Sequence, residues 1–133
     1  MEGSRVNEIS SAALAYLGDS VIELRVREFL VGCGMSHASK LNAAALDFVR
    51  ASAQADAVEK IIDLLDEKEN AAFRRGRNIG HTNIPKSATA LQYRRATGME
   101  ALFGYLHLCG KNERIDELFS IAYADIMEKY REG

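Results

Sequence analysis

Long alanine- and leucine-rich segments between the glycines constrain the fold of this chain more than any other feature. Their apolar residues recur at spacings of three and four, which is typical of helices, and not in the alternation typical of strands. Only one proline, Pro85, occurs in the 133 residues. We therefore expect an all-α fold with almost no strand. A chain of this length supports one hydrophobic core, so we expect a single domain over residues 1–133.

The first long helix is defined by a polar start and a glycine-rich end. Ser10 or Ser11 can act as its N-cap, the helix is expected over residues 12–31, and the glycines of residues 32–34 end it. Apolar residues at helical spacing predict the side that faces the core: Leu14, Leu17, Val21 and Leu24.

The remaining helices are less sharply bounded. Ser36 or Ser39 can start the next helical stretch, and residues 40–65 are long enough for one bent helix or for two consecutive helices. Residues 78–87 have the composition of an exposed loop. A last helix is expected to be capped by Asn112 and to continue to about residue 131.

Two residue pairs have the capping-box spacing. Asp66 and Glu69 predict a short helix that ends in an arginine-rich run. Thr97 and Glu100 have the same spacing and predict a helix over residues 98–109.

Several protein classes are excluded by composition. The isolated cysteines, Cys33 and Cys109, and three scattered histidines give no zinc-ligand spacing. The first residues lack the apolar run of a secretory signal, and no run of about 18 apolar residues occurs. We expect a reduced cytoplasmic protein with no membrane partner.

An acid and a glycine interrupt the most apolar helix of the chain. Gly18 costs roughly 1 kcal/mol relative to alanine inside a helix, and Asp19 in apolar surroundings needs a partner or a metal. Alternatively, Gly18 permits close helix packing and Asp19 meets only solvent or an arginine. Glu23 lies one turn beyond Asp19 and could share its face.

A second acid, Glu100, also begins an apolar segment. Gly104 follows it by one turn and leaves the adjacent surface without a side chain. The capping-box spacing with Thr97 offers an alternative explanation in which Glu100 is purely structural.

Basic residues are segregated along the chain. Residues 70–99 contain no acid and carry a formal charge of +6, whereas the other residues carry −8. Such segregation suits phosphate binding, although helix capping or ion pairing could account for about two of these side chains. The basic residues are Arg74, Arg75, Arg77, Lys86, Arg94 and Arg95.

Two motifs and the segment between them resemble a known family. The segment LAYLGDSVIE resembles the signature helix of ribonuclease III enzymes, and ATGMEALFGYLHL resembles their later acidic motif. With the intervening RRGRN, PK and YRRATG, the order and spacing resemble most the short subfamily Mini-ribonuclease III, a nuclease domain without the double-stranded-RNA-binding domain. The resemblance covers nearly the whole chain from about Leu14.

The resemblance implies a metal-dependent active site. Asp19 and Glu100 would be its catalytic residues and would bind Mg²⁺, with Mn²⁺ as a substitute. Larger ribonucleases III have two further acids where this chain has Ala15 and Thr97. Mini-ribonucleases III resemble this chain in lacking both, so one firmly bound magnesium is expected rather than two. Glu23 could orient a metal-bound water.

The resemblance also implies a helical-bundle homodimer with two active sites, which suits a duplex of opposite-polarity strands. The signature helix would form the interface through Tyr16, Leu17 and Ile22. Double-stranded RNA would be cut to 5′-phosphate and 3′-hydroxyl ends. Recognition through phosphates and 2′-hydroxyls would involve Arg74, Arg75, Arg77, Asn78, Lys86, Arg94 and Arg95.

By the same resemblance, the substrate would be the precursor of large-subunit (23S) ribosomal RNA, with a ribosomal protein as a helper. An alternative is a non-catalytic dimeric helical module that binds structured RNA without cutting it. A purely structural helical interaction domain is a further alternative, but it would make the basic segment accidental.

Overall fold

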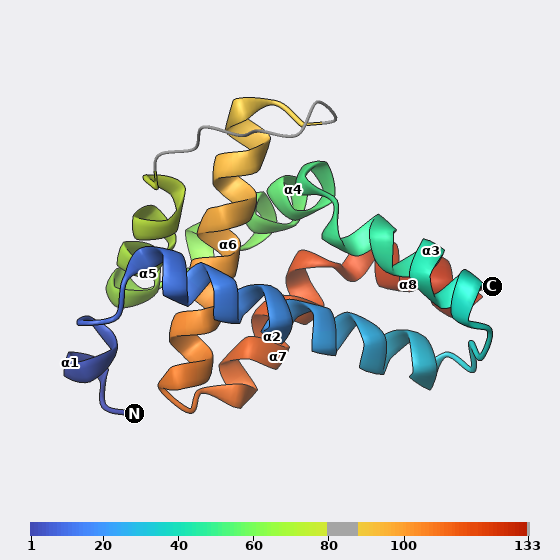
Figure 1. Ribbon diagram of the computed structural model, residues 1–133. Helices are drawn as coiled ribbons and strands as arrows, with labels where there is room; N and C mark the ends of the chain where they lie inside the picture. Colours follow the sequence, from blue (N-terminus) through green and yellow to red (C-terminus); the bar gives the residue numbers. More distant parts are fainter. Residues whose placement is uncertain (80–87, 133) are drawn as a thin grey trace.

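The computed structural model describes residues 1–79 and 88–132 (Figure 1). Every regular element within these ranges is a helix, which confirms the predicted all-α fold. The elements are α1 (Gly3–Val6), α2 (Ser11–Gly32), α3 (Ala38–Val49), α4 (Ala51–Ile61), the 3₁₀ helix η1 (Ile62–Leu64), α5 (Glu67–Arg77), α6 (Ala90–Leu108), α7 (Asn112–Ala122) and α8 (Ala124–Glu132).

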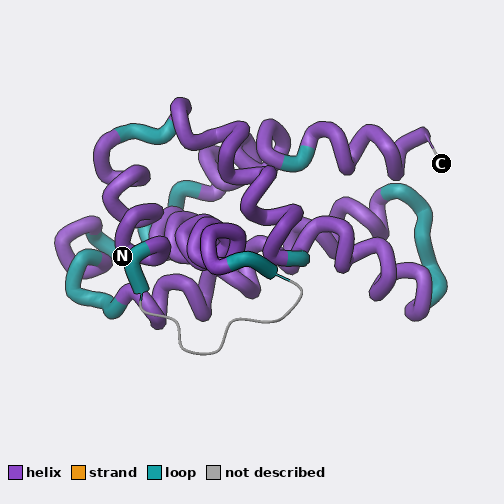
Figure 2. The backbone as a smooth tube through the Cα atoms, turned by 90° about the horizontal axis from the view of Figure 1, so that it is seen from above, coloured by secondary structure: helices purple, strands orange, loops and turns teal. Residues whose placement is uncertain are grey.

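Helix α6 is the centre of the arrangement. Helices α2, α4, α5 and α7 all contact it, and Figure 2 shows the other helices gathered around it in a view nearly along its axis. From Ala96 to Leu106, every residue of α6 except Glu100 is buried. Helix α6 therefore carries the Glu100 carboxylate within a segment that is otherwise buried.

The contact between α2 and α6 is made by backbone rather than by side chains. A Cβ atom added at Gly18 would lie 1.6 Å from the carbonyl oxygen of Glu100, and one at Gly104 would lie 2.1 Å from that of Leu14. No side chain fits at either position. The two glycines therefore allow the helices to cross at direct backbone contact, and Figure 1 shows α2 crossing α6.

The predicted first helix is confirmed with small changes. The Ser10 hydroxyl accepts a hydrogen bond from the Ala13 amide at 3.1 Å and caps α2. Leu14 and Val21 are buried, but the prediction for Leu24 is wrong because this side chain is 54% exposed. The crossing at Gly18 turns α2 so that Leu24 lies away from α6.

The stretch after α2 forms two consecutive helices, α3 and α4, which resolves the alternative left open above. The chain breaks at Arg50, whose extended backbone (ψ 145°) separates them. Neither Ser36 nor Ser39 caps α3. Its N-cap is His37, without a side-chain hydrogen bond.

Helix α6 begins at Ala90, two turns before the start that its capping-box pair predicted. Thr89 and Gln92 form the actual capping box, with both bonds at 3.1 Å. Thr97 lies inside the helix and its hydroxyl donates to the Tyr93 carbonyl at 2.9 Å. Gly98, which resembled a helix start, is instead required by packing, because a Cβ there would lie 2.7 Å from the Phe73 ring. The capping explanation of Glu100 is therefore wrong.

The predicted last helix is divided in two. Tyr123 separates α7 from α8, with its backbone at φ −110°. Its buried hydroxyl donates to the Phe48 carbonyl at 2.9 Å, which holds the junction against α3. The N-cap of α7 is Lys111 and not Asn112.

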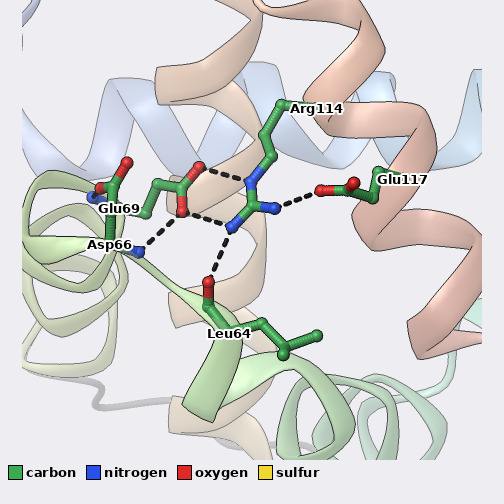
Figure 3. Close-up of polar contacts among 5 residues, drawn as sticks. All are labelled: Leu64, Asp66, Glu69, Arg114 and Glu117. Atoms are coloured by element: carbon green, nitrogen blue, oxygen red, sulfur yellow. Dashed lines mark hydrogen bonds and ion pairs between the residues drawn. The ribbon is translucent and has the colours of Figure 1, made fainter.

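A buried ion pair joins the start of α5 to α7 (Figure 3). Glu69 is 2% exposed and accepts two hydrogen bonds from Arg114, at 2.8 and 2.9 Å. The same arginine donates to the Leu64 carbonyl and to Glu117. Glu69 also accepts from the Asp66 amide at 2.9 Å, so the predicted capping box is confirmed.

The glycine contact leads to a prediction about stability. Gly104→Ala should lower the free energy of unfolding by about 3 kcal/mol or more, because the added methyl group would overlap the Leu14 carbonyl oxygen. Chemical denaturation measures this change. Gly32→Ala at the end of α2 is the matched control, because nothing lies within 4 Å of a Cβ atom added there. Equal effects of the two substitutions would contradict a packing role for Gly104.

Candidate active site

The backbone crossing of α2 and α6 brings the two predicted acids together. Asp19 directly follows Gly18 on α2, and Glu100 is the residue whose carbonyl Gly18 contacts. Asp19 is exposed and Glu100 is half-buried. The two carboxyl groups are neighbours, and a protonated Glu100 can donate a hydrogen bond to Asp19.

The environment of the pair disfavours two negative charges. Burial, followed by the charge of Asp19 and the hydrogen bond to it, raises the pKa of Glu100 to about 8. Glu100 therefore keeps its proton at neutral pH unless a positive charge stabilises its ionised form. A divalent cation between the carboxylates would remove this repulsion.

The available donors fit a hard cation. Both are carboxylate oxygens, which Mg²⁺ and Mn²⁺ accept, and no third Asp, Glu, His or Cys in residues 1–79 and 88–132 completes a larger ligand group. Mg²⁺ commonly retains several waters and is held by one or two carboxylates. The donor set is suited to one such ion.

Two cavities meet at Glu100. The smaller, of about 270 Å³, also contains Asp19 and Tyr16, and the larger, of about 660 Å³, extends towards α3 and α4. Tyr93 and Thr97 line both cavities together with Glu100. Their spacing places these three residues on one face of α6. Glu100 is therefore accessible from both sides.

The family of the chain follows from comparison with known proteins. Residues 12–111 match the family model described as "Ribonuclease III domain", and this range includes both acids. The chain belongs to the ribonuclease III family.

Relatives and a solved structure agree with this assignment. The chain is 43% identical over 116 residues to Mini-ribonuclease 3 of Symbiobacterium thermophilum, a match covering 87% of this chain and 88% of the relative. It is 37% identical over 115 residues to Mini-ribonuclease 3 of Enterococcus faecalis, covering 85% and 87%. A crystal structure of a protein from Fusobacterium nucleatum superposes with a TM-score of 0.81 at 32% identity, covering 89% of this chain and 94% of that one.

The resemblance inferred from the two acidic motifs is thus confirmed. As a member of the ribonuclease III family, the chain is an endoribonuclease that acts on double-stranded RNA. Among the described residues, none of the helices is both long enough and apolar enough to span a membrane.

The end of helix α5 lies close to the carboxylate pair. Ile79, just beyond the end of α5, lines the smaller cavity, so the end of α5 adjoins the site. Arg74 and Arg94 are exposed and form no ion pair with the described residues. Arg77 lies over the Phe73 ring and donates to Asn78 at 3.3 Å. The guanidinium charges of these arginines are not neutralised by an acid among the described residues, so they can interact with a ligand.

Two of the predicted RNA-binding arginines have structural partners. Arg75 donates to the Ile9 carbonyl and to the Ser11 hydroxyl, and Arg95 forms an ion pair with Glu59. Of the two, only Arg95 forms the kind of ion pair that was expected to account for part of the basic segment. Lys86 lies outside the described residues.

Glu23 is not brought to the carboxylate pair. It forms an ion pair with Arg27 at 2.8 Å, one turn further along α2. It lines a different cavity, between α2 and α3. The structure therefore gives no support to the hypothesis that Glu23 orients a metal-bound water.

The three residues expected at a dimer interface differ in exposure. Tyr16 is 84% exposed, an unusual state for a large aromatic side chain, and Leu17 is half-buried. Ile22 is fully buried within the protomer. It has no surface to offer a partner, so the interface prediction is wrong for Ile22.

Sequence analysis did not identify Tyr93, Thr97 and Gln54 as site residues. Tyr93 and Thr97 could have been found from helical spacing had α6 been recognised as one helix. Gln54 belongs to α4, far from both acids in sequence, and lines the larger cavity. No local pattern marks it.

Proposed function

We propose that Asp19 and Glu100 together bind one Mg²⁺, with Mn²⁺ as a substitute, and form the catalytic centre of a single domain over residues 1–133. The observation that carries this proposal is the hydrogen-bonded carboxylate pair at the glycine crossing. Burial of the Glu100 carboxylate within α6 costs free energy, and a role in binding a ligand would explain why this acid is there.

The bound ion would supply a hydroxide near neutral pH and would neutralise charge that develops on the attacked phosphate. Asp19 and Glu100 would hold this ion in position. Glu100 is held by the interior of α6, and Asp19 by the adjoining turn of α2, so their separation is fixed before RNA binds. Attack of water on phosphorus with departure of the 3′ oxygen yields the 5′-phosphate and 3′-hydroxyl ends expected from the resemblance.

Substituting the two acids tests this centre. Asp19→Asn and Glu100→Gln should each lower the rate of duplex-RNA cleavage by at least about a hundredfold, because each removes one charged ligand. RNA affinity should remain within a few-fold of wild type, and Glu100→Gln should leave the melting temperature of the metal-free protein equal or higher. Glu23→Gln, an acid-to-amide change on the same helix, is the control and should cleave normally. Loss of folding in either variant would show a structural role instead.

We propose that RNA binds to basic and polar residues at the end of α5 and in the first turns of α6. Arg74, Arg77, Asn78 and Arg94 are the described members that remain available, and Lys86 is retained as a proposal from sequence. A-form RNA is recognised mainly by its phosphates and 2′-hydroxyls, which suits arginines without base-reading geometry.

Salt dependence tests this assignment. Arg74→Ala should weaken binding to duplex RNA regardless of its sequence and should lower the salt-dependence slope by roughly 1, because one phosphate contact is lost. Arg27→Ala removes the same charge outside the basic segment and is the matched control. Unchanged binding by the Arg74 variant, measured by fluorescence anisotropy, would contradict the proposed surface.

A homodimer is proposed because two strands of opposite polarity need two oppositely oriented sites. Tyr16 supports this proposal, since it is exposed beside the smaller cavity and would be covered by a partner. Sedimentation should give twice the chain mass for wild type and the chain mass for Tyr16→Glu. A monomeric wild-type protein would refute the dimer.

The physiological substrate is proposed from the resemblance to be the large-subunit (23S) ribosomal RNA precursor in the cytoplasm, with a ribosomal protein as a helper. Depletion of the protein should lengthen the ends of that RNA, and end sequencing detects this.

Incubation with labelled duplex RNA, with and without Mg²⁺, distinguishes the enzyme from a binding module. Metal-dependent cleavage favours the enzyme, whereas a gel shift without cleavage favours the non-catalytic module.

A further inference from the structure

One buried side-chain amide forms no hydrogen bond within the described part of the chain. The buried polar or charged residues of the described chain are Gln54, Glu69 and Thr97. Glu69 bonds to Arg114, and Thr97 donates to a backbone carbonyl. The side-chain amide of Gln54, a residue that is 3% exposed, forms no hydrogen bond with any other described residue.

Such a group is costly to leave unpaired. A buried donor or acceptor without a partner costs about 1–3 kcal/mol, and buried polar groups are almost always paired with protein or with ordered water. An apolar side chain of similar size would avoid this cost. Because no described residue satisfies it, the presence of Gln54 points to ordered water as its partner.

The position of Gln54 suggests where that partner lies. It is on the first turns of α4, which packs against α6, and it lines the larger cavity together with Glu100 and Thr97. The cavity, of about 660 Å³, has ample room for water. Glu100 provides oxygen atoms that can accept hydrogen bonds from water in the same cavity.

The small exposure of Gln54 restricts the size of its partner. A side chain that is 3% exposed can contact a water molecule, but a phosphate or ribose of a rigid RNA duplex cannot approach it. Direct RNA binding is therefore disfavoured, and a water bridge to the carboxylate is favoured.

We propose that Gln54 is a positioning residue whose amide, through a water in the larger cavity, holds the Glu100 carboxylate in the orientation that receives the divalent cation. This inference rests on the proposed function, in which Asp19 and Glu100 bind that ion. Groups that orient a ligand in this way are commonly worth 10–100-fold in metal affinity.

Metal binding by the RNA-free protein provides the main test. Gln54→Met keeps the side-chain size but removes the amide, and Mn²⁺ affinity measured by calorimetry should fall about tenfold or more. The melting temperature without metal should be unchanged or higher, because an unpaired amide has been removed. At saturating Mn²⁺, duplex cleavage should return to within about threefold of wild type, as expected when only metal binding is impaired.

The matched control is Val58→Ala. Val58 is fully buried on the same helix, one turn beyond Gln54, and is absent from the lining of the cavity. Its truncation should lower the melting temperature while Mn²⁺ affinity stays within about twofold of wild type. A general loosening of α4 would instead weaken Mn²⁺ binding in both variants, and that result would overturn the proposal.

Other outcomes are equally decisive. Mn²⁺ affinity of Gln54→Met within twofold of wild type would overturn the positioning role while leaving the proposed function intact. Failure of the wild type to bind Mn²⁺ would overturn both. If Gln54→Met does not fold, a high-resolution crystal structure of the wild type decides: a water bonded to both Gln54 and Glu100 supports the proposal, and its absence refutes it.

Discussion

The direct backbone contact between α2 and α6 is the constraint on which the rest of the structure depends. Side chains at Gly18 or Gly104 would overlap carbonyl oxygens of the opposite helix, so the crossing exists only with glycine at both positions. The same contact uses the Glu100 carbonyl and places Asp19 one residue away. Because backbone atoms set the separation of the two acids, rotamer changes elsewhere in the core do not alter the helix positions that carry them.

The site contains groups that reduce stability, and other contacts offset them. The raised pKa of Glu100 shows that its charged form is disfavoured at this position. The buried side chain of Gln54 forms no hydrogen bond with the described residues. By contrast, Glu69 is buried more deeply but is neutralised by two hydrogen bonds from Arg114. A buried carboxylate can therefore be satisfied in this fold. The absence of such a cationic partner for Glu100 among the described residues supports the proposal that it binds a ligand.

Local signals in the sequence predicted the elements whose boundaries are local. The Ser10 cap and the Asp66 capping box are confirmed because each needs only neighbouring residues. The same capping rule failed at Thr97 because Gly98 serves packing against Phe73, a contact that sequence spacing does not reveal. The break at Tyr123 depends on a hydrogen bond to Phe48, 75 residues away in sequence, so it was equally unpredictable.

The candidate site divides in the same way. The two acids could be recognised as site residues because a carboxylate within an apolar helix is costly. Gln54 could not be recognised in this way, because only the packing of α4 against α6 brings it to the site. Charge segregation predicted a basic surface, but folding ties Arg75 and Arg95 to protein partners. Net charge along a segment therefore overstates the charge available to RNA.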